Sequence, residues 1–333
     1  MEGREEGLWI KFVFFIISPL PNPLPEGEGD LQEVILRMPV IRTFLLCILI
    51  MAALPAGAEN KGGYPTLWDR HDPVLQQQLD KVMGTLGYDR AIREKRLAVV
   101  LVDITRLDKP RVAALNGNTM IYAASVPKLA ILLAAFVEIR EGNMTLDDET
   151  RKSLTEMIRY SSNQQATRML NRVGKERLLE ILQSEEFDLY DPEVGGGLWV
   201  GKEYGKSPAY QRDPLHNFSH GATAMQVARF YYLLETGQVV GKKLSAEMKA
   251  ILGNPGIKHK FVKGLAGYPG VKIYRKSGSW KQWHGDSAIV EAGNNKYIVV
   301  GLVEDANGGV WLSRMIKPIH ELMVPGQADY YDH

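Results

Sequence analysis

The residues with the clearest chemical potential form a serine–lysine pair in the segment Ser125-Val126-Pro127-Lys128. Residues three apart share one helix face, so the Lys128 amine can reach the Ser125 hydroxyl. A lysine in a dry site has a lowered pKa and can take the proton from a serine, which is otherwise a poor nucleophile. The pair predicts acyl transfer at Ser125. A helix-capping serine beside a surface lysine is the structural alternative.

A second polar motif, Ser161-Ser162-Asn163, occurs once in the chain. It lies between two predicted helices, where side chains can project into a cleft. A capping serine followed by a turn asparagine would explain the motif without chemistry.

A third motif, Lys276-Ser277-Gly278, also occurs once and is followed by Ser279 at the end of a predicted strand. Its structural alternative is an edge-strand lysine that leads into a bulge or turn glycine. The three motifs together are far more specific than any one of them, because each occupies a different predicted element.

Hydrophobic periodicity indicates the elements that must position these residues. Residues 125–140 are apolar almost all round, which is typical of a helix buried on every side. Residues 183–221 are rich in Gly, Pro and Asp and predict a long loop, and such loops are usually functional. The other predicted helices are 73–86, 146–159, 163–182, 223–235, 245–252 and 311–323, and the predicted strands are 97–104, 111–115, 271–277, 285–291 and 297–303.

Strands near both ends of this order, with helices between them, predict an α+β fold. We expect one antiparallel sheet of about five strands that pairs the terminal segments, with the first and last helices covering it. The central helices would form an all-helical lobe. The three motifs come from both parts and can meet only where the sheet and the helical lobe pack together.

In their order along the chain and in the predicted elements that carry them, the three motifs resemble those of the penicillin-recognising serine hydrolases, and most of all the class A β-lactamases. The resemblance spans roughly residues 68–325 and implies a β-lactamase/transpeptidase-like fold. It implies that Ser125 is the acylated nucleophile and Lys128 its base partner. Ser161 would pass the proton to the leaving nitrogen, and Asn163 would bind the substrate amide.

The same resemblance assigns substrate binding to the third motif. Lys276 and Ser277 would hold the substrate carboxylate. Gly278 belongs to this binding motif, and the backbone N–H groups of Ser125 and Ser279 would form the oxyanion hole.

The sequence departs from the class A pattern at three places. Ser162 stands where those enzymes usually carry Asp, and the first two motifs are closer together than usual, so part of the helical lobe looks trimmed. The long loop lacks the Glu-Pro-x-x-Asn pattern that supplies the base for deacylation. Its nearest match is Asp191-Pro192-Glu193-Val194-Gly195. Asp191, Glu193 or neither is the base, since acids in a turn also have a purely structural explanation.

Four further residues have both a functional and a structural interpretation. His284 follows the third motif and either lines the cleft or is a polar strand-end residue. Trp199, Tyr204 and Trp280 either form aromatic walls for a substrate or pack in the core or on the surface. The seven histidines show no metal-ligand spacing, so neither a metal nor another cofactor is expected.

The first part of the chain predicts export. Residues 38–58 have the pattern of a signal peptide, with a basic start, an apolar run and a small-x-small cleavage site at Ala58. Residues 1–37 lie upstream of that signal, and we interpret them as a mis-assigned or disordered leader. The only cysteine, Cys47, lies inside the signal. A single domain over residues 59–333, periplasmic or secreted and without a membrane anchor, is therefore expected.

The sequence leads to one main functional hypothesis and two alternatives. The main hypothesis is hydrolysis of β-lactams through an acyl-Ser125 intermediate. The alternatives are a peptidoglycan D,D-peptidase and a penicillin-binding module with slow or absent deacylation. The expected partner is a small β-lactam or D-Ala-D-Ala-like substrate, and a monomer is expected. The formal net charge of +1 is too small to suggest a nucleic-acid partner.

Overall fold

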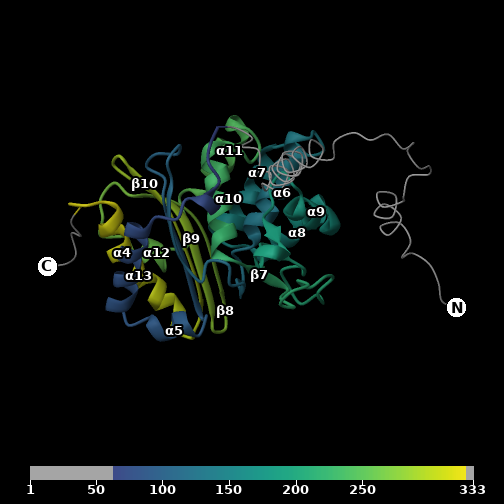
Figure 1. The fold of residues 1–333 in the computed structure, drawn as a ribbon. Helices are drawn as coiled ribbons and strands as arrows, with labels where there is room; N and C mark the ends of the chain where they lie inside the picture. Colours follow the sequence, from purple (N-terminus) through teal and green to yellow (C-terminus); the bar gives the residue numbers. More distant parts are fainter. Residues whose placement is uncertain (1–62, 328–333) are drawn as a thin grey trace, which may run out of the picture. The chain divides into compact units, whose positions relative to one another are not determined.

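The computed structural model describes residues 63–327, within the second of two compact units, Met1–Glu59 and Asn60–His333. The expected leader (1–37) and signal (38–58) lie outside the described residues, as do the two ends of the expected 59–333 domain. The fold below is that of the described part alone (Figure 1).

A five-stranded antiparallel sheet in the order β2-β1-β10-β9-β8 is the centre of the fold. Its strands are β1 (Leu97–Asp103), β2 (Arg111–Leu115), β8 (Lys272–Trp280), β9 (Trp283–Ala292) and β10 (Asn295–Glu304). Strand β1 pairs with β10 from Leu97↔Val303 to Asp103↔Tyr297, so the two ends of the fold are joined by one ladder. The expected α+β class, the strand number and the pairing of terminal segments are confirmed.

Strand β8 forms one edge of this sheet and carries the third motif. Its pairing with β9 continues through Ser279↔His284 to Trp280↔Trp283. The strand therefore extends three residues beyond the predicted end at 277, because the ladder continues through the motif itself. The edge position leaves one side of the motif without a strand neighbour.

The two faces of the sheet bury two separate hydrophobic cores, since alternate residues of a strand point to opposite faces. In β1, the side chains of Leu97, Val99 and Leu101 pack into one core and those of the intervening residues into the other. The first core is covered by the first and last of the described α-helices, α4 (Pro73–Thr85) and α13 (Gly308–Met323), as expected, and by two short helices (Figure 1). The short helices are α5 (Asp89–Arg93) and α12 (Phe261–Gly264).

The second core joins the sheet to the helical lobe. Helix α6 (Lys128–Arg140) lies inside this lobe and buries eleven of its residues, which fits its apolar surface on all sides. The predicted helix 163–182 is two helices, because Gly174 adopts a φ of 96° that ends the first. The remaining helices are α7 (Asp148–Arg159), α8 (Asn163–Val173), α9 (Lys175–Gln183), α10 (Ala224–Thr236) and α11 (Lys242–Leu252).

The long segment 183–221 is more ordered than expected. It contains β4 (Tyr190–Asp191), the 3-10 helix η3 (Pro192–Val194), β5 (Gly196–Gly197), β6 (Trp199–Val200) and the start of β7 (His220–Ala222). Strand β7 pairs with both β6 and β3 (Ile121–Tyr122), which directly precedes the first motif. The segment is thus fastened beside Ser125. Within residues 63–327, no helix is long and apolar enough to cross a membrane.

Candidate active site

The predicted nucleophile lies in a tight turn between β3 and α6. Helix α6 begins at Lys128 rather than at Ser125, and the preceding turn closes with hydrogen bonds of the i→i+3 type, including Lys128 N to Ser125 O at 3.3 Å. Side chains three apart nearly eclipse each other in such a turn. The turn therefore keeps Ser125 and Lys128 on one side, and the contact between the Lys128 amine and the Ser125 hydroxyl stays a prediction.

The backbone before Ser125 is strained, and strand β8 packs closely against it. Ala124 has a φ of 50°, which a residue with a side chain rarely adopts. A Cβ atom on Gly278 would lie 2.4 Å from Ala123 O and 2.6 Å from Ser125 N. Only glycine allows this approach, because it has no Cβ atom. Gly278 therefore lets the turn of residues 123–128, which we call the nucleophile turn, lie against the edge strand β8.

The Lys128 amine is the hub of the site. This fully buried side chain donates to Asn163 Oδ1 at 2.8 Å, to Ser161 O at 2.6 Å and to Ser161 Oγ at 3.4 Å. The structure thus brings the second motif, which is distant in sequence, onto the lysine of the first. The Ser161 hydroxyl, the Asn163 amide and the Lys128 amine form one hydrogen-bonded cluster.

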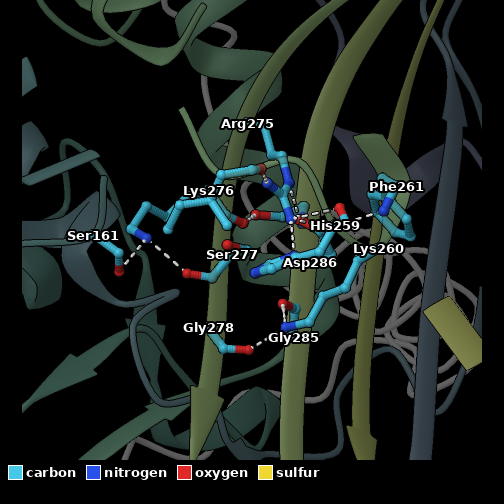
Figure 2. Close-up of polar contacts among 12 residues, drawn as sticks. Ser161, His259, Lys260, Phe261, Arg275, Lys276, Ser277, Gly278, Gly285 and Asp286 are labelled. Atoms are coloured by element: carbon cyan, nitrogen blue, oxygen red, sulfur yellow. Dashed lines mark hydrogen bonds and ion pairs between the residues drawn. The ribbon is translucent and has the colours of Figure 1, made fainter. Parts of the chain in front are cut away.

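Ser161 connects the first and third motifs. Its hydroxyl also accepts a hydrogen bond from Lys276 Nζ at 3.0 Å (Figure 2). Ser161 has a φ of 57°, a strained conformation of the kind that collects at functional sites. Ser162, by contrast, is the N-cap of α8 and accepts from Gln165 N at 3.2 Å. The capping explanation therefore applies to Ser162, and Ser161 is free to face both amines.

Burial lowers the pKa of both lysine amines, because it disfavours their charged form. It lowers the pKa of the Lys128 amine to about 7. It also holds the pKa of the Lys276 amine well below its ordinary value, and the nearby positive charge of Lys128 adds to the effect. A neutral Lys128 amine at physiological pH can accept a proton, as nucleophile activation requires.

The rest of the third motif lies next to this cluster, on strand β8. Ser277 is 7% exposed, and its carbonyl oxygen accepts from Lys276 Nζ at 2.6 Å. The Ser279 hydroxyl lies 3.3 Å from His284 Nδ1 and 2.9 Å from Lys260 Nζ. His284 thus contacts the motif, and burial lowers the pKa of its ring.

Neither acid that was considered as a deacylation base contacts the Lys128 cluster. Asp191 caps η3 by accepting from Glu193 N at 2.8 Å, and the Glu193 side chain is exposed. The negative charge of Asp191 acts on Asp188 and Arg229, and it favours their protonated forms. Among residues 63–327, no carboxylate forms an ion pair with Lys128, and burial alone shifts its pKa.

The long segment instead places an aromatic ring beside the lysine. The Tyr204 ring centroid lies 4.6 Å from Lys128 Nζ, and its hydroxyl donates to Ala124 O at 3.4 Å. Its neighbour Glu203 points elsewhere, to Lys175 at 2.6 Å. Behind Tyr204 lies the buried ring of His220, at 4.3 Å between centroids, and burial lowers the pKa of that ring to about 4.

The other aromatic candidates divide between the two interpretations. Trp199 is buried in the core against Tyr190, with centroids 4.6 Å apart, so the packing interpretation holds for it. Trp280 is 56% exposed at the end of β8. Within the described residues, no group of three His, Cys, Asp or Glu side chains could hold a metal ion.

Three charged residues behind the motif were missed by the sequence reasoning. Arg275 and Asp286 form a buried ion pair at 2.7 Å between β8 and β9, and Lys260 donates to the same two strands. The three residues are far apart in the chain and fit no motif spacing, so the sequence does not mark them as a group. The alternation of β8 does place Arg275 on the face opposite to Lys276.

Comparisons with known proteins identify the family and the fold of this chain. The profile of the β-lactamase enzyme family matches residues 76–154 and 149–319, so the chain belongs to that family. It is a penicillin-recognising serine hydrolase by family and fold. A comparison with curated proteins found no significant sequence match.

Solved structures show the same fold at low identity. The protein PBP-A superposes with a TM-score of 0.58 at 17% identity, over 78% of this chain and 98% of PBP-A. A β-lactamase from Sphaerobacter thermophilus gives 0.58 at 15% identity, over 75% and 99% of the two chains. A class A β-lactamase representative from Bacteroides cellulosilyticus gives 0.56 at 15%, over 74% and 97%. At these identities the likeness establishes the fold alone.

Proposed function

We propose that this protein forms an acyl-enzyme at Ser125 with β-lactams or D-Ala-D-Ala-like peptides and releases the acyl group slowly. It would act as a penicillin-binding protein of the D,D-peptidase type rather than as a fast β-lactamase. The observation that carries this choice is that the Lys128 amine contacts Ser161, Asn163 and the Tyr204 ring. These groups would serve acylation, and among residues 63–327 no carboxylate forms an ion pair with Lys128 that would support deacylation.

The acylation step follows from the hydrogen bonds of the cluster. The neutral Lys128 amine takes the proton of the Ser125 hydroxyl while the Ser125 Oγ–C bond forms at the substrate carbonyl. The proton then passes through the Ser161 hydroxyl, which both lysine amines contact, to the leaving nitrogen as the C–N bond breaks. The Lys128 amine bonds Ser161 and Asn163 in the free enzyme, and its hydrogen bond to the Ser125 hydroxyl would form when substrate binds.

The substrate would be held by the residues around this path. Asn163 offers its side-chain amide, and the third motif offers Lys276 and Ser277 for a carboxylate. Backbone N–H groups of Ser125 and Ser279 would stabilise the oxyanion, and Gly278 keeps these two segments in contact. We assign these roles to the same residues that the family resemblance implies.

Deacylation separates the two candidate activities. Hydrolysis of the ester requires a base that activates water, and the described part of the loop directs Tyr204 rather than an acid at Lys128. A tyrosine whose pKa is raised by burial does not serve as a base at neutral pH. A point variant of the similar protein PBP-A is described as an acyl-enzyme complex with penicillin G, which supports acylation by a β-lactam in this fold.

Intact mass spectrometry with a chromogenic β-lactam tests the proposal. We expect a stable adduct on the wild-type protein, little turnover, no adduct on Ser125→Ala, and cleavage of D-Ala-D-Ala peptides. Ser313→Ala, at a helical serine outside the site, is the matched control and should label normally. Rapid turnover would favour β-lactam hydrolysis, and no adduct at all would exclude Ser125 as a nucleophile.

A place outside the cytoplasm would suit such a substrate, and we propose export with cleavage near Ala58. Amino-terminal sequencing of the natural protein tests this. A mature chain that begins before residue 38 would contradict both the signal and the interpretation of the first 37 residues as a leader.

A further inference from the structure

A second buried lysine lies behind the third motif. Lys260 is 3% exposed and directly precedes α12, and its amine donates to Gly278 O, to Ser279 Oγ at 2.9 Å and to Gly285 O at 3.0 Å. In Figure 2, Lys276 extends to Ser161 while the Lys260 side chain ends at Gly278 and Gly285. The two lysines therefore serve different parts of β8.

The Gly278 carbonyl and the Ser279 N–H belong to the same planar, trans peptide group, so they point in opposite directions. Gly278 is paired with Gly285 of β9, and Lys260 contacts the carbonyl oxygens of both. With the Gly278 carbonyl on the β9 side, the Ser279 N–H points to the free edge of β8. The nucleophile turn lies close by, as the contact between Gly278 and Ser125 N shows.

The position of Lys260 is enforced by the buried ion pair. Asp286 accepts from Phe261 N at 3.0 Å, directly after Lys260. Arg275 donates to Ile257 O at 2.8 Å and to His259 O at 3.2 Å, directly before it. Lys260 itself has a φ of 53° and a ψ of −121°, a strained conformation for a residue with a side chain. The hydrogen bonds of Phe261 and His259 hold Lys260 in this strained conformation, and they thereby direct its side chain toward β8 and β9.

We propose that Lys260 is a positioning residue for the oxyanion hole: it holds the Gly278–Ser279 peptide so that the Ser279 N–H faces the reacting carbonyl. A cation on the carbonyl side also polarises the peptide and strengthens its N–H as a donor. This inference rests on the proposed acylation of Ser125. It gives Lys260 a part in stabilising the transition state without contact with the substrate.

The charge of Lys260 is retained at neutral pH. Burial lowers the pKa of its amine to about 8, with the positive charge of Arg275 acting in the same direction and Asp286 opposing both. No described carboxylate forms an ion pair with the amine. Its positive charge therefore acts on its three hydrogen-bond acceptors, which are Gly278 O, Gly285 O and Ser279 Oγ.

The test compares Lys260→Met, Lys260→Gln and the control Lys258→Met, an exposed lysine of the same segment. The concentration dependence of penicillin labelling separates the non-covalent dissociation constant from the acylation rate constant. Phenylboronic acid, which carries no carboxylate, reports on the oxyanion hole alone, since its serine adduct is tetrahedral. Thermal melting reports whether each variant is folded.

We expect Lys260→Met to lower the acylation rate constant by about tenfold to a hundredfold and to weaken boronate binding in parallel. The dissociation constant for penicillin should stay the same. Lys260→Gln, which keeps a neutral donor, should lie between Lys260→Met and wild type, and it carries the test if Lys260→Met does not fold. Lys258→Met should match wild type.

Two results would overturn the inference. One is wild-type acylation and boronate binding in both folded Lys260 variants. The other is weaker binding of penicillin alone with unchanged boronate affinity, which would make Lys260 a carboxylate-binding residue. Failure of the wild-type protein to react with either probe would instead refute the proposed function, so the two failures are distinguishable.

Discussion

The Lys128 amine donates a hydrogen bond to the Asn163 side-chain oxygen at 2.8 Å, which joins the first residue of α6 to the first residue of α8. Together with its hydrogen bonds to Ser161, this contact joins Lys128 of the first motif to two residues of the second. The two motifs therefore form one polar unit that holds together the residues proposed as the base, the proton relay and the amide-binding group.

Removal of the Lys128 amine should nearly abolish acylation. Lys128→Met keeps the length of the side chain but not the base, and general base catalysis contributes about a hundredfold to ten-thousandfold. We expect labelling by penicillin to slow by that factor, measured by intact mass against time. Lys152→Met, at an exposed lysine of α7, is the matched control. Wild-type labelling in Lys128→Met would exclude this lysine as the base.

Acylation should depend on pH around neutrality. Burial lowers the pKa of Lys128 to about 7, and only the neutral amine can accept the serine proton. The rate of labelling should therefore rise as pH increases through about 7 and then level off. Stopped-flow labelling below, at and above this pH measures it, with thermal melting at each pH as the control for folding. A rate that falls with rising pH would contradict the assignment.

Gly278→Ala should damage the site. The new Cβ would lie 2.4 Å from Ala123 O and 2.6 Å from Ser125 N, and backbone atoms cannot yield as a flexible side chain can. We expect acylation to fall at least about tenfold, with a lowered melting temperature. Gly84→Ala in α4 meets its nearest atom, Asp89 Oδ1, at 3.8 Å, so it should be neutral or stabilising. Normal labelling in Gly278→Ala would show that the two segments separate in solution.

Tyr204→Glu should speed release of the acyl group. It would place a carboxylate where the aromatic ring now lies 4.6 Å from Lys128 Nζ, and such a group can activate water. We expect the lifetime of the penicillin adduct to shorten by about tenfold or more. Tyr204→Phe keeps the ring and should retain the long lifetime. An unchanged lifetime in folded Tyr204→Glu would place the deacylating water elsewhere.

Breaking the buried ion pair should destabilise the fold. Asp286→Ala leaves Arg275, which is 3% exposed, without its partner and also removes the acceptor for Phe261 N. Loss of one partner of such a pair costs about 3–5 kcal/mol of unfolding free energy. Chemical denaturation measures it. Asp108→Ala, in the exposed pair with Arg106, should change stability little. Equal small effects would mean that water reaches Arg275.

Much of the fold and of the site was predictable because the signals are local. The apolar runs at 97–104 and 297–303 predicted strands, found at Leu97–Asp103 and Asn295–Glu304. The apolar surface of 125–140 predicted a buried helix, found at Lys128–Arg140. The division of the predicted helix 163–182 at Gly174 was missed. The hydrophobic periodicity continues across this residue, whereas its φ of 96° is not helical. The short strands of 183–221 were missed because two-residue pairings carry no period.

The sequence by itself determined the three motifs and the α+β order that brings them to the junction of the sheet and the helical lobe. Residue type and spacing are enough there, because a side chain three positions away shares one face. Only the tertiary structure decided that Lys128 meets Asn163 and Tyr204 rather than a carboxylate, and that Lys260 lies behind Gly278. These contacts join residues far apart in the chain, and backbone strain and packing against β8, which no local pattern encodes, fix their geometry.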